Sequence, residues 1–359
     1  MAKSGQHGGN VLQMAHKFGV DPRMVLDFSA NINPMGLPDS LKSALIENIG
    51  CLEHYPDIDY TELNQTLAQH VGCQTEWVLP GNGATELIFL WVHYFRPKTA
   101  LLVEPSFAEY RRALERYECQ IQSFDLKEPN GFALDDSLLD ALSADLDCLF
   151  LCTPNNPTGL MPSHSLLEAV IDKCQALHIA LFIDESFIDF LPNNPGCSKL
   201  LDGNPHLYIL RSMTKFYAMP GLRLGYLLSS NQLLLDTIRA QREPWTINAF
   251  AALSAQVVLN DDDYTEATHT WLSEQQTYLY HALCEFAALE VFKPSANYLF
   301  FKLNIANFDL QSALMKQQIL IRHCANYPGL NHQFYRVAVK SEVDNKRLIE
   351  ALKECLPNG

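Results

Sequence analysis

The feature that most constrains the fold is a regular alternation of short apolar segments and helical segments through the first two thirds of the chain. Four segments are rich in strand-forming residues, and each ends in polar, glycine or proline residues: 99–107, 148–157, 179–187 and 205–215. Helical patterns such as residues 165–178 lie between them. Strands separated by helices form right-handed βαβ units. The sequence therefore predicts an α/β fold, with a mostly parallel sheet covered by helices on both faces.

The pattern changes after residue 230, where a long helix is expected over residues 259–291. Three shorter, mixed segments follow it: 296–305, 319–327 and 334–341. This change predicts a second, smaller α+β domain. We divide the chain into an N-terminal arm with part of the small domain, a large domain and a C-terminal small domain, at residues 1–45, 46–265 and 266–359.

Composition narrows the class of protein. The chain has 359 residues, of which 48% are hydrophobic, and its formal net charge is −15. The material for a core is ample, and the charge argues against nucleic acid or an anionic membrane as a partner. Ten scattered cysteines form no C-x-x-C pair, so we expect reduced thiols and no metal site. With no apolar signal region and no run near the ~20 residues that span a bilayer, a cytoplasmic protein is expected.

The segment PGNGATELIFLWVHYF, residues 80–95, places glycines before an apolar helix. Free amides at a helix start bind anions, commonly phosphate, so Gly83, Ala84 and Thr85 are candidates for a phosphate cradle. The alternative is a plain loop in which Thr85 caps a core helix.

Polar residues follow two of the apolar strands. Asp184 comes directly after one of them, and burying its carboxylate is costly unless a cation or a proton donor meets it. The alternative is that Asp184 or Glu185 only caps a turn. The segment CTPNNPTG, residues 152–159, predicts a rigid loop that presents the amide of Asn156, or else an ordinary turn.

Lys215 follows another apolar strand, between Ser212 and Thr214, with Arg223 eight positions later. A sheltered lysine loses part of its preference for the charged form and becomes an amine nucleophile that can form a Schiff base. The hydroxyls and the arginine suit a phosphate. The alternative is a lysine that reaches from a strand end to solvent.

Together these clusters supply a phosphate cradle, an amide donor, a carboxylate and an imine-forming lysine, in that order on consecutive strand ends. Pyridoxal 5′-phosphate needs one such partner for each of its polar groups. The joint pattern therefore predicts a pyridoxal-phosphate site.

On these motifs the chain resembles, over nearly its whole length, the fold-type I pyridoxal-phosphate enzymes of the aspartate and histidinol-phosphate aminotransferase superfamily. The resemblance implies that Lys215 carries the cofactor, Asp184 pairs with its ring nitrogen and Asn156 donates to its phenolic oxygen. It also implies that Phe107 stacks on the ring and that a homodimer forms, because a tyrosine of the neighbouring subunit reaches the cofactor phosphate. The residues it assigns to that phosphate are Gly83, Ala84, Thr85, Ser212, Thr214, Arg223 and Tyr55.

One position departs from the superfamily pattern. Many of these enzymes have a tyrosine three residues after the aspartate, where this chain has Phe187. A phenylalanine cannot donate a hydrogen bond, so we expect the phenolic oxygen to depend more on Asn156.

Within the superfamily the chain is most similar to the phosphothreonine decarboxylases of cobalamin biosynthesis. Five strings carry this likeness: HGGN, LDFSANINPMGLP, MTKFYAMPGLRLGY, IRHCANYPGL and YRVAVKS. The likeness implies decarboxylation of O-phospho-L-threonine to (R)-1-amino-2-propanol phosphate. The residues implied for the substrate are His7, Gly8 and Arg322 at its phosphate, and Asn31, Asn156 and Arg336 at its amino-acid end.

Anchoring the two anionic ends of this substrate decides which bond to Cα stands perpendicular to the cofactor ring and breaks. Two alternatives to this activity stay open: an aminotransferase for a phosphorylated compound such as histidinol phosphate, and a non-catalytic module with this fold. A third alternative concerns the N-terminus alone, where HGGN would belong to a disordered tail.

Overall fold

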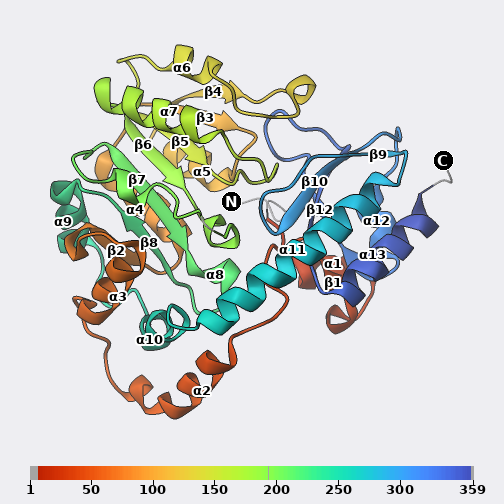
Figure 1. The fold of residues 1–359 in the computed structure, drawn as a ribbon, viewed down its shortest axis with the longest axis horizontal. Coiled ribbons are helices and arrows are strands. Elements are labelled where there is room, and N and C mark those ends of the chain that lie inside the picture. Colours follow the sequence, from red (N-terminus) through yellow and green to blue (C-terminus); the bar gives the residue numbers. More distant parts are fainter. Residues whose placement is uncertain (1–6, 193, 357–359) are drawn as a thin grey trace.

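The structure is a computed structural model that describes residues 7–192 and 194–356. Its centre is a seven-stranded sheet with the order β2-β8-β7-β6-β5-β3-β4 (Figure 1). The neighbouring strands from β7 to β4 pair in parallel, and β8 runs antiparallel to both of its neighbours. The strands are β2 Val78–Gly81, β3 Thr99–Glu104, β4 Gln120–Asp125, β5 Cys148–Cys152, β6 Ala180–Asp184, β7 Leu207–Ser212 and β8 Gly225–Leu228.

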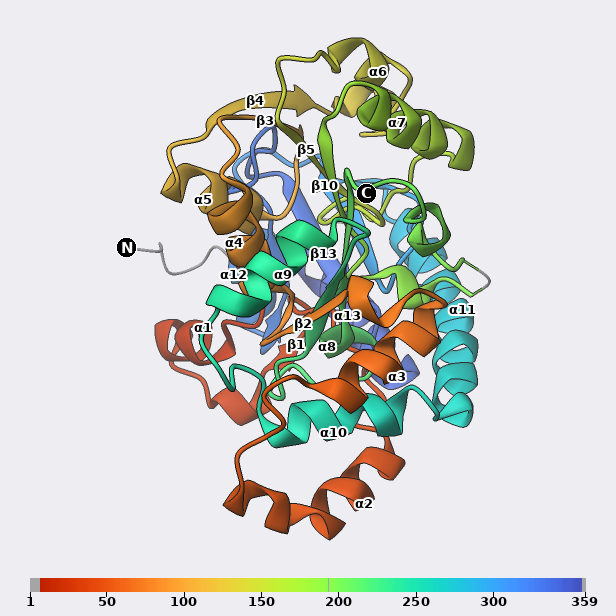
Figure 2. The same ribbon diagram turned by 90° about the vertical axis from the view of Figure 1, so that its left-hand side faces the viewer.

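Both faces of this sheet are buried along its central strands, whereas the edge strand β4 is largely exposed. Successive side chains of a strand point to opposite faces. Along β5, Leu149 and Leu151 join one apolar cluster, whereas Cys148, Phe150 and Cys152 join the other. Helices α4, α5 and α9 cover the second of these faces, and α3, α7, α10 and α11 contribute to the first. In Figure 2 the sheet lies between α4, α5 and α9 on the left and α7 and α11 on the right.

Helix α7, His164–Ala176, lies close to the helical pattern predicted at residues 165–178. Gly72 ends α3 in a left-handed conformation, which glycine adopts without strain. The bounds are α2 Asp39–Glu47, α3 Thr61–Val71, α4 Ala84–Phe95, α5 Ala108–Arg116, α6 Ser137–Ala141, α7 His164–Ala176, α8 Met213–Phe216, α9 Gln232–Gln241 and α10 Ala249–Val258.

A second, antiparallel sheet has the order β12-β13-β10-β9 and lies beside the first (Figure 1). In that view the long helix α11 runs diagonally from beside α10 toward α12. The elements here are α11 Asp262–Cys284, β9 Leu289–Val291, β10 Tyr298–Leu303, α12 Leu310–Met315, β11 Ile319–Leu320, β12 Arg322–His323, β13 Phe334–Ala338 and α13 Glu342–Cys355.

The N-terminal segment joins this second part. Strand β1, Leu26–Asp27, pairs in parallel with β11, and Met14 of α1, Val11–Phe18, packs against Met315 and Leu320. The domain boundaries given above remain a prediction.

The predicted α/β fold with a mostly parallel sheet is confirmed. The predicted helix over residues 259–291 is wrong at its C-terminal end, because Leu289–Val291 forms β9 and pairs with β10 instead. Among the helices of residues 7–192 and 194–356, none is both long and apolar enough to cross a membrane.

Candidate active site

Three parallel strands bring the polar residues of the sequence motifs to one edge of the large sheet. Strands β5, β6 and β7 are neighbours, and Cys152 lies opposite Asp184 at their carboxyl ends. Helix α8, which carries Lys215, follows β7 directly. Because the carboxyl ends of parallel strands meet at one edge, Asn156, Asp184 and Lys215 gather there.

Lys215 points into the protein. Its Nζ donates to Ser212 Oγ over 2.8 Å, and the hydroxyls of Ser212 and Thr214 are 2.9 Å apart. Burial lowers the pKa of Lys215 and the charge of Arg223 lowers it further, whereas the charge of Asp184 raises it. The alternative of a lysine that reaches solvent is therefore wrong, and Lys215 is an amine with an increased neutral fraction.

Asp184 is buried and both of its oxygens accept hydrogen bonds. The hydroxyl of Tyr110 donates to Oδ2 over 2.5 Å, and the backbone N–H of Ser186 donates to Oδ1 over 2.8 Å. The alternative in which Asp184 caps a turn is therefore also present, because the backbone N–H of Ser186 binds the same carboxylate that faces the site. Sequence reasoning missed Tyr110, since it lies on α5 and no local pattern links it to Asp184.

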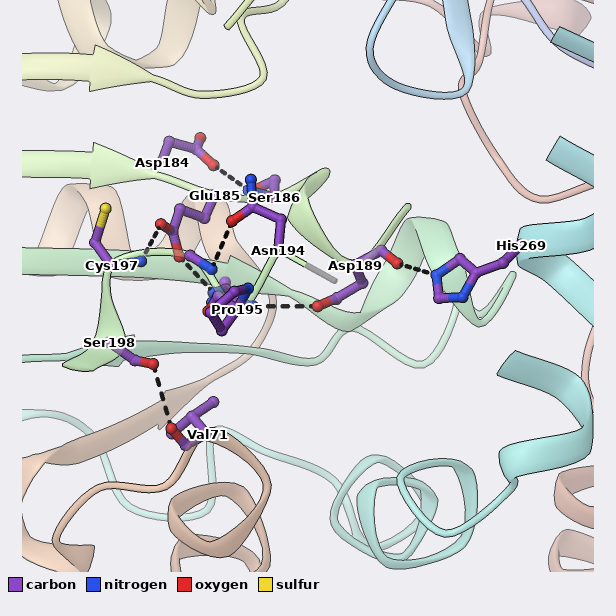
Figure 3. A network of polar contacts seen from close by, with 12 residues as sticks. Val71, Asp184, Glu185, Ser186, Asp189, Asn194, Pro195, Cys197, Ser198 and His269 are labelled. Carbon is purple, nitrogen blue, oxygen red and sulfur yellow. Dashed lines mark hydrogen bonds and ion pairs between the residues drawn. The ribbon is translucent and has the colours of Figure 1, made fainter. Parts of the chain in front are cut away.

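A buried charge pair between Arg211 and Glu185 holds the ends of β6 and β7 together. Arg211 Nε lies 2.7 Å from Oε2 of Glu185, whose side chain is 0% exposed, and Arg211 Nη1 lies 3.1 Å from Asp189 Oδ1. Glu185 also accepts from the backbone N–H of Cys197 over 2.8 Å. Figure 3 shows this network beside Asp184. It fixes the residues that directly adjoin Asp184 and Ser212.

The start of α4 forms a cradle for an anion. Gly83 stands at the N-cap with φ +83°, and a Cβ there would meet Arg223 Nη2 at 2.4 Å. A Cβ on Gly225 would likewise meet the backbone nitrogen of Ala84 at 2.6 Å. The alternative in which Thr85 caps the helix is wrong, because Thr85 lies within it and no side chain caps α4. The first amides of α4 and the Arg223 guanidinium therefore face the same space.

The loop after β5 meets the second sheet. Asn155 is held by Pro105 and Thr158, whereas the Asn156 side chain accepts hydrogen bonds from Arg336 and, over 3.3 Å, from the hydroxyl of Tyr327. Asn156 thus joins the strand-end residues to the small sheet.

Arg322 and Arg336 lie directly opposite each other on β12 and β13. Each is 5% exposed, and opposite residues of an antiparallel pair share one face of the sheet. Arg336 Nη2 donates to the carbonyl of Ser29 over 2.8 Å, and within the described residues its Nε has no hydrogen-bond partner. Arg322 Nη2 donates to Asn326 Oδ1 over 2.7 Å. Two buried guanidinium groups so placed favour an anionic ligand.

The N-terminal arm contacts α5 and Ser29 at the site. His7 Nε2 lies 2.8 Å from Glu109 Oε1, and its ring centroid is 5.6 Å from that of Phe107. Gly9 donates to Ser29 Oγ over 2.8 Å. The hydrogen bond from His7 lowers the pKa of Glu109. The disordered-tail alternative is wrong for residues 7–10, which are held in place.

The remaining predicted site residues, Asn31, Phe107 and Tyr55, differ in how deeply they are buried. Asn31 is buried, and its Oδ1 lacks a hydrogen-bond partner within the described part of the chain. Phe107 is half-buried at the start of α5, beside Tyr110. Tyr55 is 81% exposed, and among the described residues its ring contacts that of Trp245, with the planes tilted by 35° and the centroids 4.7 Å apart. A single chain therefore does not bring Tyr55 into the cluster.

These residues fit pyridoxal phosphate. The site contains a lysine amine, a buried carboxylate with fixed oxygens, an aromatic ring and a helix start that Arg223 approaches closely because Gly83 lacks a side chain. Each feature matches one polar or aromatic group of that cofactor.

Comparisons with known proteins agree with this chemistry. The sequence profile of aminotransferase class I and II matches residues 23–352. The chain is 50% identical to the threonine-phosphate decarboxylase of Salmonella typhimurium, over 98% of this chain and 96% of that protein. It is 35% identical, over 96% of its length, to 40% of the adenosylcobalamin biosynthesis bifunctional protein of Leptospira interrogans.

A solved structure agrees as well. The histidinol-phosphate aminotransferase of Clostridium acetobutylicum superimposes with a TM-score of 0.87 at 32% identity, covering 92% of this chain and 98% of that one. The chain belongs to the class I and II aminotransferase family of pyridoxal-phosphate enzymes.

Proposed function

We propose that this protein decarboxylates O-phospho-L-threonine to (R)-1-amino-2-propanol phosphate for cobalamin biosynthesis, with pyridoxal phosphate held at Lys215. The observation that carries the proposal is the opposed pair Arg322 and Arg336. Like charges directly opposite each other on a sheet are destabilising, so a ligand with two anionic groups stabilises this arrangement. Phosphothreonine has two such groups, a phosphate and a carboxylate. The relative from Salmonella typhimurium, with its 50% identity, supports this substrate.

In the proposed site each part of the cofactor has its partner. Asp184 pairs with the ring nitrogen, Asn156 donates to the phenolic oxygen and Phe107 covers the ring. The phosphate is held by the start of α4, that is by Gly83, Ala84 and Thr85, and by Ser212, Thr214 and Arg223. When bound, the cofactor supplies an aldehyde that captures amines and an electron-poor ring that accepts the electron pair of a broken bond at Cα.

The chain's own residues select the bond. Arg336 holds the substrate carboxylate near Asn156, while Arg322, His7 and Gly8 hold the phosphate toward the arm. Two fixed ends would restrict rotation about the substrate's Cα and would so select the bond to the carboxylate, rather than the C–H bond, for cleavage. Lys215 in its ammonium form is the group that would protonate Cα, and its lowered pKa makes this ammonium a stronger acid.

A neighbouring subunit completes the proposed site. Tyr55, Leu52, Ile49 and Trp245 are all exposed apolar side chains, and such a patch is typical of a protein interface. In a homodimer, Tyr55 would reach the cofactor phosphate of the other subunit.

The ten cysteines are all free, which suits the cytoplasm.

A second candidate is an aminotransferase for a phosphorylated substrate, favoured by the structural likeness to the enzyme from Clostridium acetobutylicum. Incubation with phosphothreonine and no 2-oxo acid separates the two activities. A decarboxylase releases CO2 continuously, whereas an aminotransferase needs the oxo acid to turn over. Absence of CO2 release, together with turnover of histidinol phosphate and 2-oxoglutarate, would replace our proposal with the second candidate.

A further inference from the structure

Tyr110 touches the carboxylate that faces the proposed cofactor ring, although no sequence motif marked it. It lies on α5, three residues after Phe107, and its side chain is buried. Its hydroxyl donates to Asp184 Oδ2 over 2.5 Å, while Ser186 donates to Oδ1. Asp184 therefore has one protein donor on each oxygen, and each oxygen keeps a further lone pair.

These donors hold both oxygens of Asp184. Two hydrogen bonds from fixed groups restrict the rotation of the carboxylate and so set the direction in which its remaining lone pairs point. Burial, followed by the nearby charge of Asp184, raises the pKa of Tyr110 well above its usual value. The phenol thus keeps its proton and remains a donor throughout the working range of pH.

We infer that Tyr110 is a positioning residue that fixes the orientation of the Asp184 carboxylate, so that this carboxylate faces the ring nitrogen of pyridoxal phosphate and supports the proton there. This inference rests on the proposed function, which places that ring beside Asp184. Without this donor the Asp184 carboxylate could rotate away from the ring nitrogen. A ring nitrogen that no carboxylate faces would hold its proton less firmly, and the ring would then be a poorer acceptor of electrons.

A conservative substitution isolates the hydroxyl from the packing. The ring of Tyr110 lies 5.4 Å from that of Phe150 and 5.7 Å from that of Phe107, and Tyr110→Phe retains these contacts. Tyr208→Phe is the matched control. Tyr208 is also buried, and its hydroxyl accepts one hydrogen bond, from Asn231 over 2.7 Å, so its loss also removes one buried hydrogen bond.

The test uses holoenzyme reconstituted with pyridoxal phosphate labelled with 15N in the ring, and it measures the 15N chemical shift. We expect the protonated shift in the wild type and in Tyr208→Phe, and a move toward the unprotonated shift in Tyr110→Phe. The kcat of Tyr110→Phe should fall about 10-fold or more with little change in KM, since one hydrogen bond to a charged group is lost.

Three other results would contradict the inference or the proposed function, and they can be told apart. An unchanged 15N shift in Tyr110→Phe would overturn the inference and leave the proposed function intact. Equal changes in both variants would assign Tyr110 a purely structural role and overturn it as well. Wild-type protein that binds no labelled cofactor would overturn the proposed function itself.

Discussion

Arg322 and Arg336 lie opposite each other on neighbouring antiparallel strands, both almost fully buried. Arg336 contacts Asn156 and the carbonyl of Ser29, which places it toward the strand ends of the large sheet, whereas Arg322 contacts Asn326. In the proposed site Arg336 would hold the carboxylate and Arg322 the phosphate, and mutation can separate these two roles.

Arg322→Gln should weaken binding of phosphothreonine by about 1.5–3 kcal/mol, the value of a hydrogen bond to a charged group, and should hardly change binding of unphosphorylated threonine. Arg336→Gln is the matched control, because it should weaken both amino acids alike. Dissociation constants from cofactor absorbance provide the measurement. If Arg322→Gln weakened both ligands equally, Arg322 would not belong to the phosphate site.

The lowered pKa of Lys215 gives a pH dependence with a definite sign. Only the neutral amine captures the cofactor aldehyde, so the capture rate of the apoprotein should rise with pH, with its inflection below that of an ordinary lysine. Arg223→Gln removes a cation that lowers this pKa, so the inflection should move up. Asp184→Asn removes an anion that raises it, so the inflection should move down.

Stopped-flow absorbance at a series of pH values measures these three curves. Lys215→Ala serves as the blank and should show no absorption band of lysine-bound cofactor. Shifts of the same sign in the two charge variants would contradict the electrostatic explanation.

The N-terminal arm depends on a close backbone contact at Gly8. A Cβ there would lie 2.0 Å from the carbonyl oxygen of Ser29, so Gly8→Ala must displace the arm together with His7. We expect kcat/KM for phosphothreonine to fall about 10-fold or more, as for the loss of one charged hydrogen bond, with little change in Tm. Gly50→Ala is the control, because a Cβ at Gly50 meets nothing within 4 Å. A normal kcat/KM in Gly8→Ala would exclude the arm from substrate binding.

The buried pair of Glu185 and Arg211 makes a prediction about stability. Arg211→Met leaves the fully buried Glu185 carboxylate without its cation, which should cost about 3–5 kcal/mol. The double variant Arg211→Met with Glu185→Met should cost less than Arg211→Met alone, because no buried charge then lacks a partner. Denaturant unfolding of the apoprotein compares them. A double variant that lost the sum of two large single effects would show that packing, rather than charge, dominates here.

The sequence predicted the parts of the site that follow directly from apolar strands. Asp184, Asn156 and Lys215 each come after such a strand, and parallel strands bring their ends together. Tyr110 could not be predicted, since its contact with Asp184 spans 74 residues and depends on how α5 packs on the sheet. The opposition of Arg322 and Arg336 depends on strand register, which the short strand β12, Arg322–His323, does not specify by its own pattern.

The position of Tyr55 illustrates another limit. Its side chain is 81% exposed, so packing within the chain does not define its position, and its contact with the cofactor phosphate of a second subunit stays a prediction. The predicted end of α11 failed for a similar reason, because pairing of β9 with β10 overrides the local helical pattern after Cys284.

The central claim is that this protein breaks the carboxylate bond of a substrate anchored at both anionic ends. The most direct measurement is the ratio of CO2 to enzyme after incubation with excess phosphothreonine, with every 2-oxo acid removed and the cofactor absorbance followed. We predict many equivalents of CO2, an equal amount of 1-amino-2-propanol phosphate and a cofactor spectrum that returns to its starting form. No CO2, with the cofactor converted once to its amine form, would contradict the account.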